Sequence, residues 1–160
     1  MKASIKYTIL ILYFFASSEL LSQRISSFDL NSDWTTNIKS MVNEFDKIEL
    51  KETKNVLIFS LHTGFYHWTI PHTEAVMKII AENNEGFNIT LSKDIFEFEK
   101  KQISKYDIII LNNNCSIGPK RDIFWDVLKD EPNLNAEEKQ KKIKQLENNL
   151  ISFVKKGKGI

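Results

Sequence analysis

Cysteine is almost absent from this chain of 160 residues, because Cys115 is the only one. A single cysteine excludes an intrachain disulfide, so the fold must be stable without covalent cross-links. Strong charge of one sign is absent too: the formal net charge is +1, and basic residues are interleaved with acidic ones rather than gathered into a stripe. Nucleic acid is therefore not expected as a partner.

Paired metal ligands and nucleophile motifs are also lacking. The three histidines, His62, His67 and His72, are spaced five residues apart, and the chain has neither a His-x-x-x-His nor a Cys-x-x-Cys pair. No glycine-flanked elbow surrounds Cys115, which favours a buried inert thiol over a nucleophile. Gly118 lacks the neighbouring glycines of a phosphate loop. We therefore expect neither a metal ion nor a cofactor.

Long hydrophobic runs are missing, since the apolar run at residues 7–16 is shorter than the roughly 20 residues of a membrane span. Two lysines precede this run and small residues follow it, a pattern typical of a secretory signal peptide. We predict a signal peptide at residues 1–22, with cleavage after Ser18 or Ser22; an uncleaved anchor is the alternative. The mature protein is then expected in the bacterial periplasm or outside the cell, without stable membrane insertion.

The composition that remains is that of a globular protein, with 42% hydrophobic and 27% charged residues. Residues 23–54 are predicted to form a leader segment with one amphipathic helix. Residues 55–160 are predicted to form an α/β domain, because strand, helix, strand, crossover and strand follow one another. Strands are expected at 56–59, 87–91 and 106–111, and helices at 71–83 and from Asn135 onward, where Glu138 completes a capping box.

Chemistry is expected where the loops "SLHTGFYHW" and "NNNCS" leave the first and third predicted strands. In open parallel sheets, ligands bind at the carboxyl ends of strands whose connections leave in opposite directions. Imidazole can act as a general base and aromatic rings can stack on sugars. We predict catalytic roles for His62 and His67, and substrate-binding roles for Tyr66, Trp68, Asn112, Asn113 and Cys115.

A structural role for the same loops is the alternative, because aromatic residues after a strand often cover the sheet edge. His72, beside the proline that opens the second helix, is expected at the surface. The segment after "NNNCS" has Ile123, Phe124, Val127 and Leu128 at helical spacing, and forms either a flap over the site or a cover for the core.

Three blocks of this sequence together resemble one protein family. They are "VLIFSLHTGFYHWTIPHTEAV", "KYDIIILNNNCS" and "ISFVKKGKGI". In this order they are similar to the first part of a ThuA-like (trehalose-utilisation) domain, in the class I glutamine amidotransferase-like superfamily. The resemblance implies a flavodoxin-like three-layer α/β sandwich with a parallel sheet, and places His67 on the histidine of the family's Gly-Phe-x-His motif.

The resemblance also implies a function in the utilisation of carbohydrate, trehalose or a related glycoside. It does not imply glutamine hydrolysis, because family members lack the amidotransferase nucleophile elbow. The family's Gly-Gly-Gly-Phe-x-Gly-x-His element would begin at Gly157, with Lys158 replacing the middle glycine and the histidine falling beyond Ile160. The domain is therefore expected to be truncated, with its final strands missing. A non-catalytic sugar- or partner-binding module of a larger exported protein is the alternative.

Export can be tested directly. We expect N-terminal sequencing of protein isolated from its native host to find a mature chain that begins near Glu19 or Gln23, because the predicted cleavage sites precede these residues. Recovery of the chain from the cytosol with Met1 intact would contradict this prediction.

Overall fold

The computed structural model describes residues 27–47 and 49–160, and the predicted signal peptide at residues 1–22 lies outside this part of the chain. Within it, helices and strands alternate as expected for an α/β protein. None of the described helices combines the length and the apolar character needed to cross a membrane. In chain order the elements are α2 (Ser32–Asn43), β1 (Lys54–Phe59), α3 (Ile70–Asn83), β2 (Phe87–Ser92), η2 (Ile95–Phe98), α4 (Lys100–Ile103), β3 (Ile108–Leu111), α5 (Ile123–Leu128) and α6 (Ala136–Lys155).

The three strands form one parallel sheet in the order β2-β1-β3. Strand β1 is therefore central, with Leu57 opposite both Thr90 of β2 and Ile109 of β3. Beyond β3, Gly159 forms a further parallel bridge with Ile108. The sheet confirms the three strands expected from the sequence, and the third begins two residues later than predicted.

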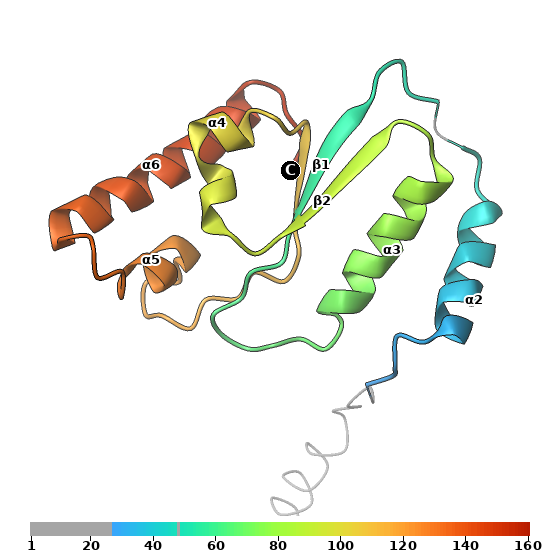
Figure 1. Cartoon of the computed structure of the whole chain (residues 1–160), viewed down its shortest axis with the longest axis horizontal. Helices are drawn as coiled ribbons and strands as arrows, with labels where there is room; N and C mark the ends of the chain where they lie inside the picture. The colour runs from blue at the N-terminus through green and yellow to red at the C-terminus, as the bar shows by residue number, and fades with distance from the viewer. Residues whose placement is uncertain (1–26, 48) are drawn as a thin grey trace, which may run out of the picture.

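Helices flank the sheet on two sides (Figure 1). Helix α3 packs beside β2 and is itself covered by α2, whereas η2, α4, α5 and α6 pack together on the other side. This is a mixed α/β arrangement with a three-stranded parallel sheet, compatible with a flavodoxin-like fold. The leader helix expected before residue 55 is α2, which adds to the layer that α3 begins.

The core explains why "VLIF" is a continuous apolar run. All four residues from Val56 to Phe59 are at most 3% exposed, because helices cover both faces of β1. Leu57 and Phe59 belong to a cluster with residues of η2, α5 and α6. Helix α5 contributes buried Phe124 and Leu128 to it, so the segment after "NNNCS" covers the core.

Local sequence signals set the bounds of α6. The side chain of Asn135 accepts hydrogen bonds from the backbone N–H groups of Glu137 and Glu138, and Glu138 in turn accepts from the Asn135 N–H. This confirms the predicted capping box. At the other end Gly157 has a φ of 80°, the left-handed conformation that commonly ends a helix.

Asp107 joins three segments at the amino-terminal ends of the strands. Its Oδ2 accepts from the N–H of Asn55 at 2.9 Å and its Oδ1 from Lys158 Nζ at 2.5 Å, while its carbonyl accepts from the N–H of Gly159 at 3.0 Å. The Lys158 ammonium, followed by the Asn55 N–H, lowers the pKa of Asp107 below its ordinary value.

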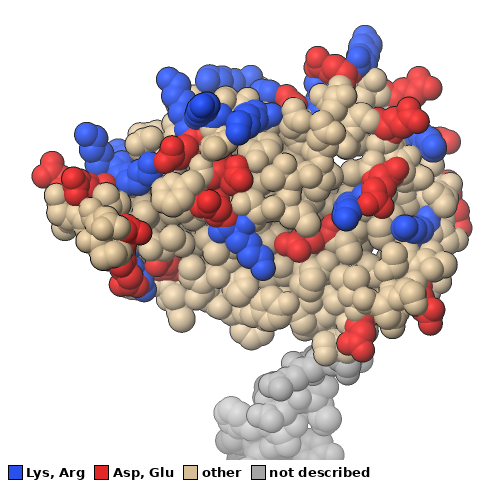
Figure 2. Space-filling view, viewed as in Figure 1, with Lys and Arg blue, Asp and Glu red and all other residues tan. Residues whose placement is uncertain are grey.

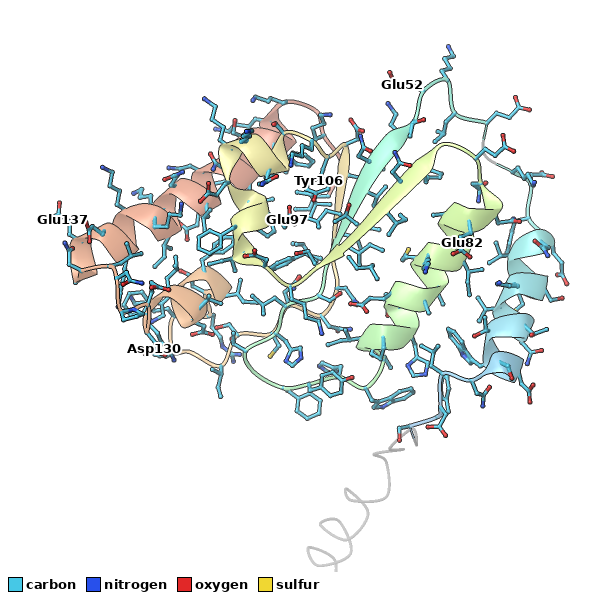
Figure 3. All side chains as sticks on the ribbon, in the orientation of Figure 1. Glu52, Glu82, Glu97, Tyr106, Asp130 and Glu137 are labelled. Carbon is cyan, nitrogen blue, oxygen red and sulfur yellow. The ribbon has the colours of Figure 1, made fainter. Side chains whose placement is uncertain are left out.

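Next to it, Tyr106 fixes the connection between β2 and β3. The Tyr106 hydroxyl donates to Glu97 Oε2 at 2.9 Å, and the two side chains point toward each other in Figure 3. Burial, together with this bond to a carboxylate, raises the pKa of Tyr106 to about 12. The hydroxyl therefore remains a donor throughout the pH range in which the fold is expected to be stable.

Asp107→Asn should lower the free energy of unfolding by about 1 kcal/mol at neutral pH, because a charge-assisted hydrogen bond is lost. A lowered pKa contributes stability that is complete above the ordinary aspartate value and is lost as the pH falls through the lowered one. The difference between the parent and Asp107→Asn, measured by urea denaturation, should therefore shrink from pH 7 to pH 3.

The matched control is Asp130→Asn. The Asp130 side chain is 83% exposed, and its ion pair with Lys129 is weak because the two charged atoms are 4.0 Å apart. This variant should match the parent at every pH. An Asp107→Asn difference that is constant with pH, or as small as that of the control, would contradict the role given to Asp107.

Candidate functional site

Two loops meet at the carboxyl edge of the sheet. The β1 loop, residues 60–69, leads from β1 to α3, and the β3 loop, residues 112–122, leads from β3 to α5. Because β2 lies on one side of β1 and β3 on the other, the two loops leave adjacent strands toward opposite halves of the molecule. This is the topological switch point predicted from the sequence, and such points form ligand sites in open α/β sheets.

Backbone hydrogen bonds tie the two loops together. The N–H groups of Thr63 and Gly64 both donate to the carbonyl of Cys115 at 2.9 Å. Gly64 is needed for this close approach, since a Cβ at that position would lie 2.9 Å from Cys115 Sγ. The thiol is half-buried against the β1 loop.

The asparagines of the β3 loop hold the β1 loop in place. Buried Asn112 uses its Nδ2 to donate to Ser60 Oγ at 3.0 Å and to the carbonyl of Ile70 at 3.2 Å. Asn114 donates to the carbonyls of Phe59 at 3.1 Å and Leu61 at 2.7 Å. Asn113 is exposed, with a φ of 53°. The amide groups of Asn112 and Asn114 thus support the loops from beneath, and a ligand role remains a prediction for Asn112 and Asn113.

Asp126 is a buried carboxylate at the centre of this contact that the sequence analysis missed. Its Oδ2 accepts from Thr63 Oγ1 at 2.5 Å, from Ser116 Oγ at 2.5 Å and from the N–H of Gly118 at 3.2 Å. The hydroxyl of Ser116, followed by that of Thr63, lowers the pKa of Asp126. A charge so placed joins both loops to α5, and its low pKa keeps it ionised at neutral pH.

The reason Asp126 was missed lies in the helical pattern of α5. Helical spacing placed Val127 on the buried stripe with Phe124 and Leu128, but Val127 is 39% exposed and Asp126 only 7% exposed. The available signal was an aspartate within the short apolar helix IFWDVL. The partner hydroxyl of Thr63 is 63 residues away in the sequence.

The two predicted catalytic histidines occupy different settings in the β1 loop. His62 is half-buried, its ring centroid lies 5.1 Å from that of Tyr66, and its buried Nδ1 has no hydrogen-bond partner among the described residues. His67 is exposed, with the ring of Phe65 4.7 Å away. Phe65 is 67% and Tyr66 52% exposed. The loop thus presents two aromatic rings and one imidazole to solvent, with a second imidazole behind Tyr66.

Trp68 and His72 belong to a separate aromatic cluster. The His72 ring lies 5.2 Å from Trp68, 4.7 Å from Phe28 and 5.2 Å from Trp34, in edge-to-face geometry. His72 is only 8% exposed, so the expected surface position is wrong: the segment that includes α2 packs over the start of α3 and covers it. Trp68 contacts Phe28 as well, and its predicted substrate-binding role remains untested.

Metal ligands do not converge in the described part of the chain, where no three His, Cys, Asp or Glu residues are grouped closely enough to hold an ion. Comparison with protein-family models, with curated proteins and with solved structures finds no match to this chain. The site must therefore be interpreted from its own geometry.

Gly118 provides a test of the Asp126 contact. A Cβ at residue 118 would lie 2.1 Å from Asp126 Oδ1, so Gly118→Ala must displace the carboxylate and should lower the free energy of unfolding by about 1–3 kcal/mol. Thermal unfolding followed by circular dichroism would measure the loss. Gly159→Ala is the control, because its Cβ would make an ordinary contact of 3.4 Å with Ile108. Equal destabilisation by both variants would contradict the contact.

Proposed function

We propose that the β1 and β3 loops form a carbohydrate site, and that the protein acts in the utilisation of trehalose or a related glycoside, as its resemblance to ThuA-like domains suggests. The single observation that carries the proposal is the pair of exposed rings, Phe65 and Tyr66, next to His67 on a loop fixed at both ends. Exposed aromatic rings on a rigid loop suit the apolar faces of sugars.

In this proposal the loop residues have distinct roles. Tyr66 and Phe65 stack on the sugar, and exposed Asn113 offers amide groups to its hydroxyls. His67 is the general base, because it is the exposed imidazole beside the stacking rings. His62, whose ring lies 5.1 Å from that of Tyr66 and whose buried Nδ1 has no hydrogen-bond partner among the described residues, is the second catalytic candidate. Export to the periplasm or beyond is part of the same proposal.

A second candidate is a binding module without catalysis. The side-chain amides of Asn112 and Asn114 favour this candidate, because they donate hydrogen bonds to backbone carbonyls and to the Ser60 hydroxyl. These donors therefore hold the loops together rather than face a substrate. Glutamine hydrolysis is not proposed, because no glycine-flanked nucleophile elbow surrounds Cys115.

The experiment is a screen of the full-length chain against trehalose, glucosides and their oxidised derivatives, with binding measured by calorimetry and turnover by product analysis. Tyr66→Ala should weaken sugar binding about tenfold, since one stacking ring is lost. His67→Ala should lower kcat by about 10²-fold or more with little change in binding.

Phe45→Ala is the matched control, because Phe45 is 72% exposed but follows α2, outside both loops. It should leave binding and turnover unchanged. Turnover that survives His67→Ala would exclude the catalytic role, and sugar binding without turnover would favour the module. Absence of binding to any sugar would reject the site itself.

A further inference from the structure

A groove lies at the opposite edge of the sheet from the two loops. It runs between α4 and the last turns of α6 and has a volume of about 700 Å³. Both elements directly precede β-structure, α4 before β3 and the end of α6 before the Gly159 bridge, so the groove borders the amino-terminal ends of the strands. Its lining residues are Lys100, Lys101, Ile103, Ser104, Asn149, Ser152, Phe153, Lys156 and Lys158.

The charge of this groove is entirely positive. Four lysines line it and no acidic residue does. Lys158 is paired with Asp107, but within residues 27–47 and 49–160 no ion pair involves Lys100, Lys101 or Lys156. Figure 2 shows the basic side chains gathered at the end of the molecule formed by α4 and the C-terminal end of α6.

The four lysines of the groove have no compensating carboxylate among its lining residues, although over the whole chain 22 basic residues are balanced by 21 acidic ones. Like charges held together around a hollow repel one another, and an anion between them relieves that repulsion. The groove is therefore expected to concentrate anions.

The donor set indicates which anion fits. The four lysine ammonium groups act as point charges with no carboxylate among the lining residues, which favours a multiply charged anion, and a phosphate monoester carries about two negative charges near neutral pH. The Ser152 side chain adds a hydroxyl, and buried Ile103 and Phe153 form an apolar floor. A volume of about 700 Å³ falls within the range of small-molecule sites.

We propose that this groove binds a small organic phosphate, with the phosphate held by Lys101 and Lys156 and the organic part against Ile103 and Phe153. The same phosphate chemistry can come from a soluble metabolite or from the headgroup of an anionic phospholipid, and the experiment separates the two. The proposal is independent of the carbohydrate site, because no residue of the β1 or β3 loop lines the groove.

The test uses the whole chain at physiological ionic strength, with pyrophosphate and glycerol 3-phosphate as soluble probes and calorimetry as the readout. The double variant Lys101→Gln/Lys156→Gln should weaken pyrophosphate binding by about tenfold or more, since two charge-assisted contacts are lost. The matched control is Lys141→Gln/Lys144→Gln, which removes the same net charge from positions of α6 that do not line the groove.

A parallel measurement uses phosphatidylcholine vesicles with and without phosphatidic acid. Binding to either phosphate source that the groove variant loses and the control keeps supports the proposal, and the source that binds more tightly identifies the ligand. Equal losses in both variants would show only an effect of net charge and overturn it. No binding of either source by the parent would also overturn it. Circular dichroism melts verify that both variants are folded.

Discussion

The rest of the structure depends on the burial of residues 56–59 of β1 between two parallel neighbours. Its backbone is paired on both sides and its side chains are covered by helices on both faces. A strand in that position can neither slip in register nor tilt without exposing apolar surface. Consequently the positions of the first and last residues of β1 are fixed. The contacts at the amino-terminal and carboxyl edges of the sheet are built around these two positions.

At the carboxyl end of β1, hydrogen bonds between polar groups fix the β1 and β3 loops relative to this strand. The Phe59 carbonyl accepts from both the backbone of Asn112 and the side chain of Asn114. Asp126 then joins Thr63 to Ser116 across the two loops. The donors of Asn114, Thr63 and Ser116 would lose these acceptors if the two loops moved apart, so the network disfavours other arrangements of the loops. The aromatic rings of the β1 loop are therefore presented on a rigid support.

At the amino-terminal end Asp107 has the equivalent structural role, but the surroundings differ. The ends of α4 and α6 carry lysines toward one hollow, and only Lys158 finds a carboxylate there. One edge of the sheet thus presents aromatic rings and histidines. The other presents a group of lysines, of which only Lys158 is paired with a carboxylate. The ligands proposed for the two edges differ accordingly, with neutral hydroxylated molecules at one and phosphates at the other.

Local signals in the sequence predicted the three strands and the helices α3 and α6, because apolar periodicity, the Asn135 cap and the Gly157 stop act over neighbouring residues. They also placed the histidine loop at the switch point. The order β2-β1-β3 was decided by pairing between segments distant in the chain. Only the tertiary structure decided that His72 is buried, that Val127 is exposed, and that Asp126 links Thr63 to Ser116. Those outcomes arise from contacts between residues distant in the chain. Hydrophobic periodicity identifies the apolar face of an element but does not indicate which polar residues will form hydrogen bonds with each other.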